Sequence, residues 1–174
     1  FNMKFLPPGR GLWAMGSPIT EERGVFMALN NCSFVSTSAL KEDGAKPFCF
    51  LMDVSMVGVG CGFDIKGAGT IEIYEPSKSI ETVVIEDTRE SWVDSLRLLI
   101  ESYVNGSKKV VFDYTKIRPA GLPIKGFGGV SSGPEPLKDM HEAIRDTLDK
   151  NIGKPISVTS IVDVMNLIGK CVVG

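Results

Sequence analysis

Apolar residues recur at helical spacing in three parts of the chain. The spacing predicts helices over 87–105, 132–151 and 157–169. Asp87 and Glu90 have the separation of a capping box, and Ser132 and Ser157 are candidate N-caps for the other two helices. The three apolar stripes are Trp92, Leu96, Leu99 and Tyr103, then Leu137, Met140, Ile144 and Leu148, then Ile161, Val164, Met165 and Ile168.

A fourth helix is expected over 48–57, which is apolar on nearly all sides and precedes the Gly58-Val59-Gly60 break. Alternating and β-branched stretches predict strands over 32–37, 62–65, 70–74 and 110–114. The glycines and prolines of 1–16 predict an ordered loop, and 41–47 reads as a charged turn. Because strands alternate with helices, the sequence favours an α/β fold over a sandwich or a bundle.

The composition is that of one globular domain, since the 174 residues are 43% hydrophobic and 23% charged. A formal net charge of -2 argues against a general electrostatic grip on nucleic acid or on a membrane surface. No apolar run reaches the roughly 20 residues of a bilayer crossing, and the N-terminus does not resemble a signal peptide. We therefore expect a soluble, cytoplasmic protein, and the start at Phe1 with an apolar end leads us to expect a segment of a longer one.

Charge is unevenly distributed along the chain. Acidic residues dominate 81–101. In the stretch that follows, 102–125, basic residues dominate and Asp113 is the one acidic residue. A basic strand and loop after an acidic helix could bind phosphate, although a solvated face that balances its neighbour is the plainer interpretation. The basic residues are Lys108, Lys109, Lys116, Arg118 and Lys125.

Two glycine-rich segments could approach a ligand. The 58–62 run resembles a dinucleotide fingerprint only superficially, because the helix precedes it and the strand follows, so it is expected to end a helix. The 126–134 segment opens a helix and could present backbone N–H groups to a phosphate, or could be a tight connection capped by Ser132.

The cysteines and the lone histidine limit the chemistry. Cys32, Cys49, Cys61 and Cys171 show no zinc-binding spacing, and His141 is expected to be solvated or to pair helices. Cys32 follows two asparagines at the start of a strand, where its thiol could be accessible at a sheet rim or could be part of the core.

Longer strings resemble one enzyme family. They are 5–16 (FLPPGRGLWAMG), 29–37 (LNNCSFVST), 58–64 (GVGCGFD), 116–121 (KIRPAG), 126–137 (GFGGVSSGPEPL) and 171–174 (CVVG). Together, and in this order, they resemble the adenosylcobalamin-dependent ribonucleoside-triphosphate reductases, the class II ribonucleotide reductases. FLPPGRGLW and SGPEPL are far more specific than a glycine pattern.

The resemblance implies part of a ten-stranded α/β barrel in which a thiyl radical, generated from adenosylcobalamin, removes the ribose 3'-hydrogen. It implies that Cys32 is one of two cysteines that reduce the substrate and are then regenerated by a thioredoxin-like reductant. The radical cysteine, the partner of Cys32 and most cobalamin contacts are expected outside this segment, and Cys49, Cys61 and Cys171 stay unassigned.

The resemblance also divides the chain. We expect residues 1–66 to start the barrel, 67–128 to be an inserted segment and a candidate effector-binding region, and 129–174 to return to barrel helices at the entrance to the specificity loop. Gly16 and Ser17 are expected to bind substrate phosphates, and Lys116 and Arg118 a deoxynucleoside triphosphate effector. No metal ligands are expected, and the full-length enzyme is expected to be a monomer.

Two other functions compete with this one. The chain could be a nucleotide-sensing module without catalysis, built on the basic strand-loop and the glycine loop. Alternatively, Cys32 could act as a nucleophile with His141 as its base, which requires the two side chains to lie within about one hydrogen bond or one bridging water of each other.

Overall fold

The computed structural model describes residues 8–124 and 129–173. Part of the expected N-terminal loop, Lys125 with the first residues of the 126–134 glycine segment, and Gly174 lie outside the described residues. The N-terminal part of the fold contains α1 (Gly9–Ala14), α2 (Pro18–Glu21), a 3-10 helix (Phe26–Leu29), β1 (Cys32–Val35), α3 (Leu40–Asp43), α4 (Lys46–Met56) and β2 (Gly60–Phe63). The remainder contains β3 (Ser77–Val84), α5 (Arg89–Val104), β4 (Lys108–Asp113), α6 (Glu135–Asp149) and α7 (Val158–Val173).

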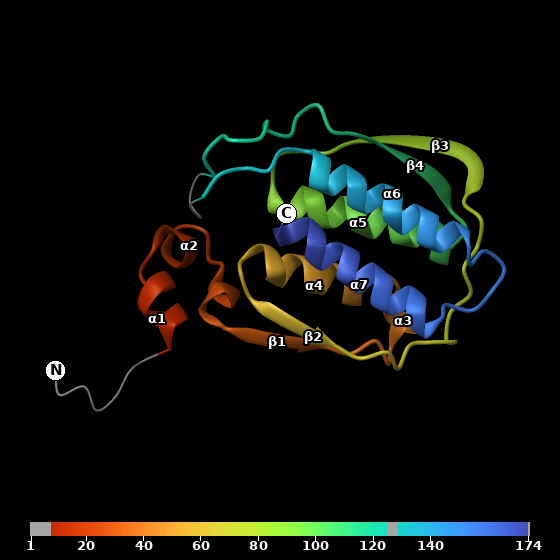
Figure 1. The fold of residues 1–174 in the computed structure, drawn as a ribbon, viewed down its shortest axis with the longest axis horizontal. Coiled ribbons are helices and arrows are strands. Elements are labelled where there is room, and N and C mark those ends of the chain that lie inside the picture. The colour runs from red at the N-terminus through yellow and green to blue at the C-terminus, as the bar shows by residue number, and fades with distance from the viewer. Residues whose placement is uncertain (1–7, 125–128, 174) are drawn as a thin grey trace.

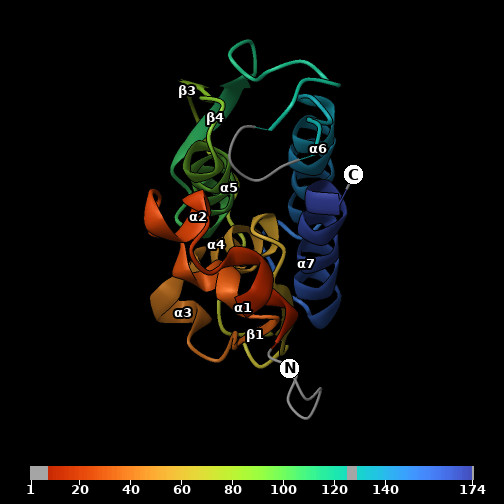
Figure 2. The ribbon, with the colours of Figure 1, turned by 90° about the vertical axis from the view of Figure 1, so that its left-hand side faces the viewer.

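Two strand–helix–strand units make up the fold. β1 pairs in parallel with β2 after α4, and β3 pairs in parallel with β4 after α5. A parallel pair needs a crossover, which a helix supplies here in both cases. Figure 1 shows the two strand pairs on opposite sides of the helices, and Figure 2 shows α4 and α5 beside α6 and α7. The predicted α/β class is confirmed.

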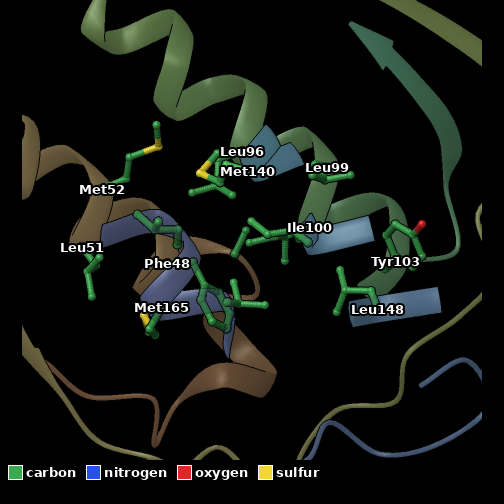
Figure 3. Packing of buried hydrophobic residues seen from close by; sticks show 14 of the residues in the cluster. Phe48, Leu51, Met52, Leu96, Leu99, Ile100, Tyr103, Met140, Leu148 and Met165 are labelled. Atoms are coloured by element: carbon green, nitrogen blue, oxygen red, sulfur yellow. The ribbon is translucent and has the colours of Figure 1, made fainter. Parts of the chain in front are cut away.

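One hydrophobic core joins both units. It contains residues from α4, α5, α6 and α7, and Figure 3 shows Phe48, Leu96, Ile100 and Met165 among its members. All twelve residues of the three predicted helical stripes except Trp92 are buried, and Trp92 is half-buried against the same core. The stripes therefore predicted the inward faces of α5, α6 and α7 correctly.

Several predicted helix ends were wrong. α5 is capped by Thr88, whose hydroxyl oxygen accepts a hydrogen bond from the Ser91 N–H at 3.2 Å, one residue after the predicted Asp87. α6 begins at Glu135 after Pro134, without the predicted Ser132 cap. Ser157 does cap α7, since its hydroxyl accepts from the Ser160 N–H at 3.0 Å, but the helix continues through Gly169 to Val173.

Short elements also depart from the prediction. Residues 9–14 of the expected loop form α1, because Pro8 precedes the helix rather than interrupting it. The 41–47 turn is occupied by α3 and the start of α4. Residues 70–74 make only an isolated bridge, Glu72 with Pro155, although Ile71 and Ile73 are buried as their alternation suggests.

The described residues contain two two-stranded sheets and not the complete ten-stranded barrel that the resemblance implies. None of the described helices is long and apolar enough to cross a membrane.

Candidate functional site

Cys32 lies on the outer face of the β1–β2 pair. Side chains alternate along both strands, so Cys32 and Phe34 are exposed while Ser33 and Val35 are half-buried. The register places Gly60 beside Cys32 and Gly62 beside Phe34. The sheet face next to the thiol is therefore bare backbone, and the sulfur is accessible.

A hollow of about 490 Å³ borders this strand start, lined by Gly9, Arg10, Trp13, Asn31 and Gly58. Arg10 holds its wall by donating from Nη1 to the Val57 carbonyl oxygen at 3.3 Å and from Nη2 to the Gly58 carbonyl oxygen. Gly58 has a φ of +79°, which ends α4 as the sequence predicts. Asn31, the neighbour of Cys32, thus opens onto a space that a small ligand can enter.

The other cysteines differ from Cys32. Burial raises the pKa of Cys49 and of Cys171 to about 12, so both are protonated and unreactive at neutral pH. Cys61 lies on the opposite face of the β1–β2 pair from Cys32 and packs against the core. All four cysteines are free thiols, and Cys32 is the one that is exposed.

Gly16 and Ser17 form the turn between α1 and α2. The Gly16 N–H donates to the Thr20 hydroxyl at 3.1 Å, and the Ser17 hydroxyl donates to the Ala14 carbonyl oxygen at 2.6 Å. A phosphate at this turn would have to replace both internal acceptors. Their predicted role stays a prediction.

A second, larger cleft of about 700 Å³ lies where α2 and the turn after it, the end of α4, the start of α5 and the end of α7 meet Arg118, Ile124 and residues 130–132. Its walls combine apolar side chains with hydroxyl, carboxylate and guanidinium groups. This mixture suits a ligand with a flat apolar part and an anionic part. Residues that line it include Arg89, Trp92, Arg118, Val130, Ser132 and Val172.

The two predicted effector residues differ in position. Arg118 lines the cleft and pairs with Asp87, with 2.5 Å between Nε and Oδ2. Lys116 is not among the lining residues, and its ammonium group pairs with Glu86 at the surface. Arg118 therefore lies in the larger cleft, and the role of Lys116 stays a prediction.

His141 is buried, so the solvated alternative is wrong, whereas the helix-pairing alternative is confirmed, because the ring joins α6 to Ser95 on α5. Its Nδ1 lies 2.8 Å from the Tyr114 hydroxyl and its Nε2 lies 3.1 Å from the Ser95 hydroxyl. Burial lowers the pKa of His141 to about 3, so the ring is neutral. Both ring nitrogens are engaged away from the exposed Cys32, so the Cys32–His141 nucleophile pair is wrong.

Comparisons with known proteins identify the family. Residues 63–148 match the family described as B12-dependent ribonucleotide reductase, insertion domain. An adenosylcobalamin-dependent ribonucleoside-triphosphate reductase of Euglena gracilis is 55% identical over 99% of this chain and 24% of its own length. A probable enzyme of the same name in Dictyostelium discoideum is 52% identical over 99% of this chain and 25% of its own. The chain belongs to the B12-dependent ribonucleotide reductase family.

A solved structure agrees with this assignment. The crystal structure of a B12-dependent, class II ribonucleotide reductase aligns with a TM-score of 0.73 and 26% identity, over 97% of this chain and 30% of that one. The chain thus has a ribonucleotide-reductase-type α/β fold and spans about a quarter of the length of the two curated reductases.

Sequence reasoning missed part of the cleft of this reductase segment. Trp92 was predicted only as a core residue and Asp87 only as part of a helix cap, and Arg89 was not singled out as a site residue. Their place at the first turn of a helix was visible in the sequence. No local sequence pattern could indicate that the ends of α4 and α7 would lie opposite the first turn of α5.

Proposed function

We propose that the full-length protein reduces ribonucleoside triphosphates to 2'-deoxyribonucleoside triphosphates, and that Cys32 is one of its two reducing thiols. The observation that carries the proposal is the exposed Cys32 sulfur beside the bare backbone of Gly60, at the edge of a hollow lined by Asn31. The two curated relatives carry the name of this activity.

Cys32 would supply half of the reducing equivalents. As the ribose 2'-hydroxyl leaves as water, Cys32 and a second cysteine together give two electrons and two protons, and their sulfurs join in a disulfide. A thioredoxin-like reductant then reopens the disulfide. The exposure of Cys32 is what such thiol exchange requires.

Adenosylcobalamin, when bound, would supply the radical that begins removal of the ribose 3'-hydrogen. Both ring nitrogens of His141 are bonded inside the core and the thiols of Cys49 and Cys171 are buried and protonated, so none of these three side chains offers a free donor atom to the cobalt. The cobalamin contacts therefore belong to other parts of the enzyme in this proposal.

The finer arrangement is part of the same proposal. Residues 1–66 begin the ten-stranded barrel, 67–128 form the inserted segment and 129–174 return to the barrel. Gly16 and Ser17 bind substrate phosphates, and the enzyme acts as a monomer in the cytoplasm.

The larger cleft is the proposed effector site. Arg118 offers a guanidinium group to phosphates, and Trp92 with Val130 offers an apolar surface to a base. The end of α7 forms one wall, and the sequence there resembles the entrance to the loop that reads a deoxynucleoside triphosphate.

The thiol role is tested by Cys32→Ser in the full-length enzyme. Loss of one reducing thiol should lower multiple turnover with a thioredoxin-type reductant by at least about 10³-fold while cleavage of adenosylcobalamin persists. Cys61→Ser is the matched control, because it removes a thiol from the opposite face of the same strand pair and should retain turnover. Undiminished turnover of Cys32→Ser would refute the role.

A nucleotide-sensing module without catalysis is the second candidate, favoured by the cleft alone. It predicts that deoxynucleoside triphosphates bind while the full-length protein shows no reductase activity at all. Reductase turnover that depends on Cys32 would exclude it.

A further inference from the structure

Two of the three arginines that line the effector cleft among the described residues, Arg89 and Arg118, are already paired with carboxylates of the same chain. Arg118 donates from Nε to Asp87 Oδ2 at 2.5 Å and from Nη1 to the Pro123 carbonyl oxygen at 2.9 Å. The side chains of Arg118 and Asp87 are 27% and 31% exposed, so water screens this pair only in part.

Arg89 is paired in the same way. It contacts Asp53 on α4 through Nη1, and its Nη2 lies 2.7 Å from Glu90 Oε1. Asp87 and Glu90 both line the cleft together with Arg89 and Arg118. A phosphate that approaches Arg89 or Arg118 therefore meets a guanidinium group that already has a carboxylate partner.

We propose that Asp87 is an affinity-determining residue of this site, an internal anion that competes with the phosphates of the ligand for Arg118. The proposal rests on the proposed effector function of the cleft. A carboxylate and a phosphate seek the same N–H groups of a guanidinium, and the two anions repel each other at close range. Repulsion grows with the charge of the ligand, so Asp87 opposes a triphosphate more than a monophosphate.

Asp87 could instead help binding by holding Arg118 in place. Asp87→Asn separates the two roles, because the amide oxygen can still accept the hydrogen bond from Nε while the negative charge is gone. If charge competition dominates, the substitution tightens binding. If positioning of the side chain by the charged pair dominates, the substitution weakens binding.

The experiment is titration calorimetry of the full-length protein with 2'-deoxyadenosine triphosphate, and then with the monophosphate. Asp87→Asn should bind the triphosphate about tenfold more tightly than the unchanged protein, and the gain should be smaller for the monophosphate. Glu81→Gln is the matched control, because Glu81 pairs with Lys108 at 3.8 Å and does not line the cleft. The part of the Asp87→Asn gain that comes from competition for Arg118 should be lost when Arg118→Gln is added, so the gain should be clearly smaller in that background.

The outcomes separate the two proposals. Triphosphate binding by the unchanged protein with equal or weaker binding by Asp87→Asn overturns the competition and leaves the effector function standing. No binding by either protein overturns both. A gain that is undiminished in the Arg118→Gln background also overturns the competition, because Arg118 is the group for which Asp87 competes.

Discussion

His141 sits in a polar network that connects three elements of the fold. The Ser95 hydroxyl donates to the Trp92 carbonyl oxygen at 2.6 Å, so it accepts from His141 Nε2–H, and the Tyr114 hydroxyl donates to Nδ1. The ring also stacks on Phe112 with 4.4 Å between centroids. A neutral ring satisfies both partners, whereas a protonated ring would lose the acceptor that Tyr114 needs.

This network predicts a pH dependence of stability. The pKa of His141 is lowered from 6.5 to about 3 by burial and by the nearby positive charge of Arg145. The stabilisation is complete above pH 6.5 and is lost as the pH falls toward about 3, because the unfolded chain takes up a proton that the folded one refuses. Over that window the free energy of unfolding should fall by up to ~1.4 kcal/mol per pH unit from this group.

His141→Gln should remove that component, because its amide can bond to both hydroxyls and does not titrate. Urea unfolding of both proteins between pH 4 and 7 gives the comparison. Parallel pH profiles for the two proteins would show that His141 does not carry this dependence.

Hydrogen bonds between Asp64 and Thr37 join the β1–β2 pair just beyond the C-terminal ends of its two strands. Asp64 Oδ1 accepts from the Thr37 N–H at 2.8 Å and from the Thr37 hydroxyl at 2.9 Å, and Oδ2 accepts from the Ser36 hydroxyl at 2.7 Å. These donors hold the pKa of Asp64 well below its usual range. The Thr37 hydroxyl also accepts from the Gly67 N–H at 2.9 Å, which draws the following loop against α3.

That close approach predicts that Gly67 cannot carry a side chain. An added Cβ would lie 2.5 Å from the Thr37 carbonyl oxygen and 2.9 Å from Leu40 Cβ, and both residues are fully buried. Gly67→Ala should therefore destabilise the chain by about 2 kcal/mol or more, as overpacking does.

Gly169→Ala is the control for that substitution. Gly169 is helical, and an added Cβ would meet nothing within 4 Å. Thermal unfolding should show a gain of about 0.5–1 kcal/mol from the better helix propensity of alanine. Equal effects of the two substitutions would mean that the contact with Thr37 does not constrain Gly67.

Helices were predicted better than strands. The stripes of α5, α6 and α7 repeat over several turns, so each helix is determined by many residues. β3 was missed because seven of its eight residues are exposed and it has no alternating apolar pattern. Its pairing with β4 depends on residues about thirty positions away.

Both strand–helix–strand units share one core, so they should unfold together. α4 belongs to the β1–β2 unit and α5 to the β3–β4 unit, and their side chains meet those of α6 and α7 in one buried cluster. Met52→Ala in α4 and Leu96→Ala in α5 should each cost about 2–5 kcal/mol of the same transition.

Tryptophan fluorescence and far-ultraviolet circular dichroism, followed through urea unfolding of each variant, report on that cooperativity. Coincident curves are expected for both variants. Two separated transitions, with Leu96→Ala shifting only one of them, would mean that the β3–α5–β4 unit is independently stable.

The sequence by itself determined the α/β class, the inward faces of the long helices and the strand that begins at Cys32. It could do so because side-chain periodicity is local, and because the family strings occur in the same order from the start of the chain to its end. The tertiary structure alone decided the burial of His141, the pairing of Arg118 with Asp87 and the cleft between α5 and α7. His141 and Ser95 are 46 residues apart and Arg118 and Asp87 are 31 apart, and no local pattern records which distant residues packing will bring together.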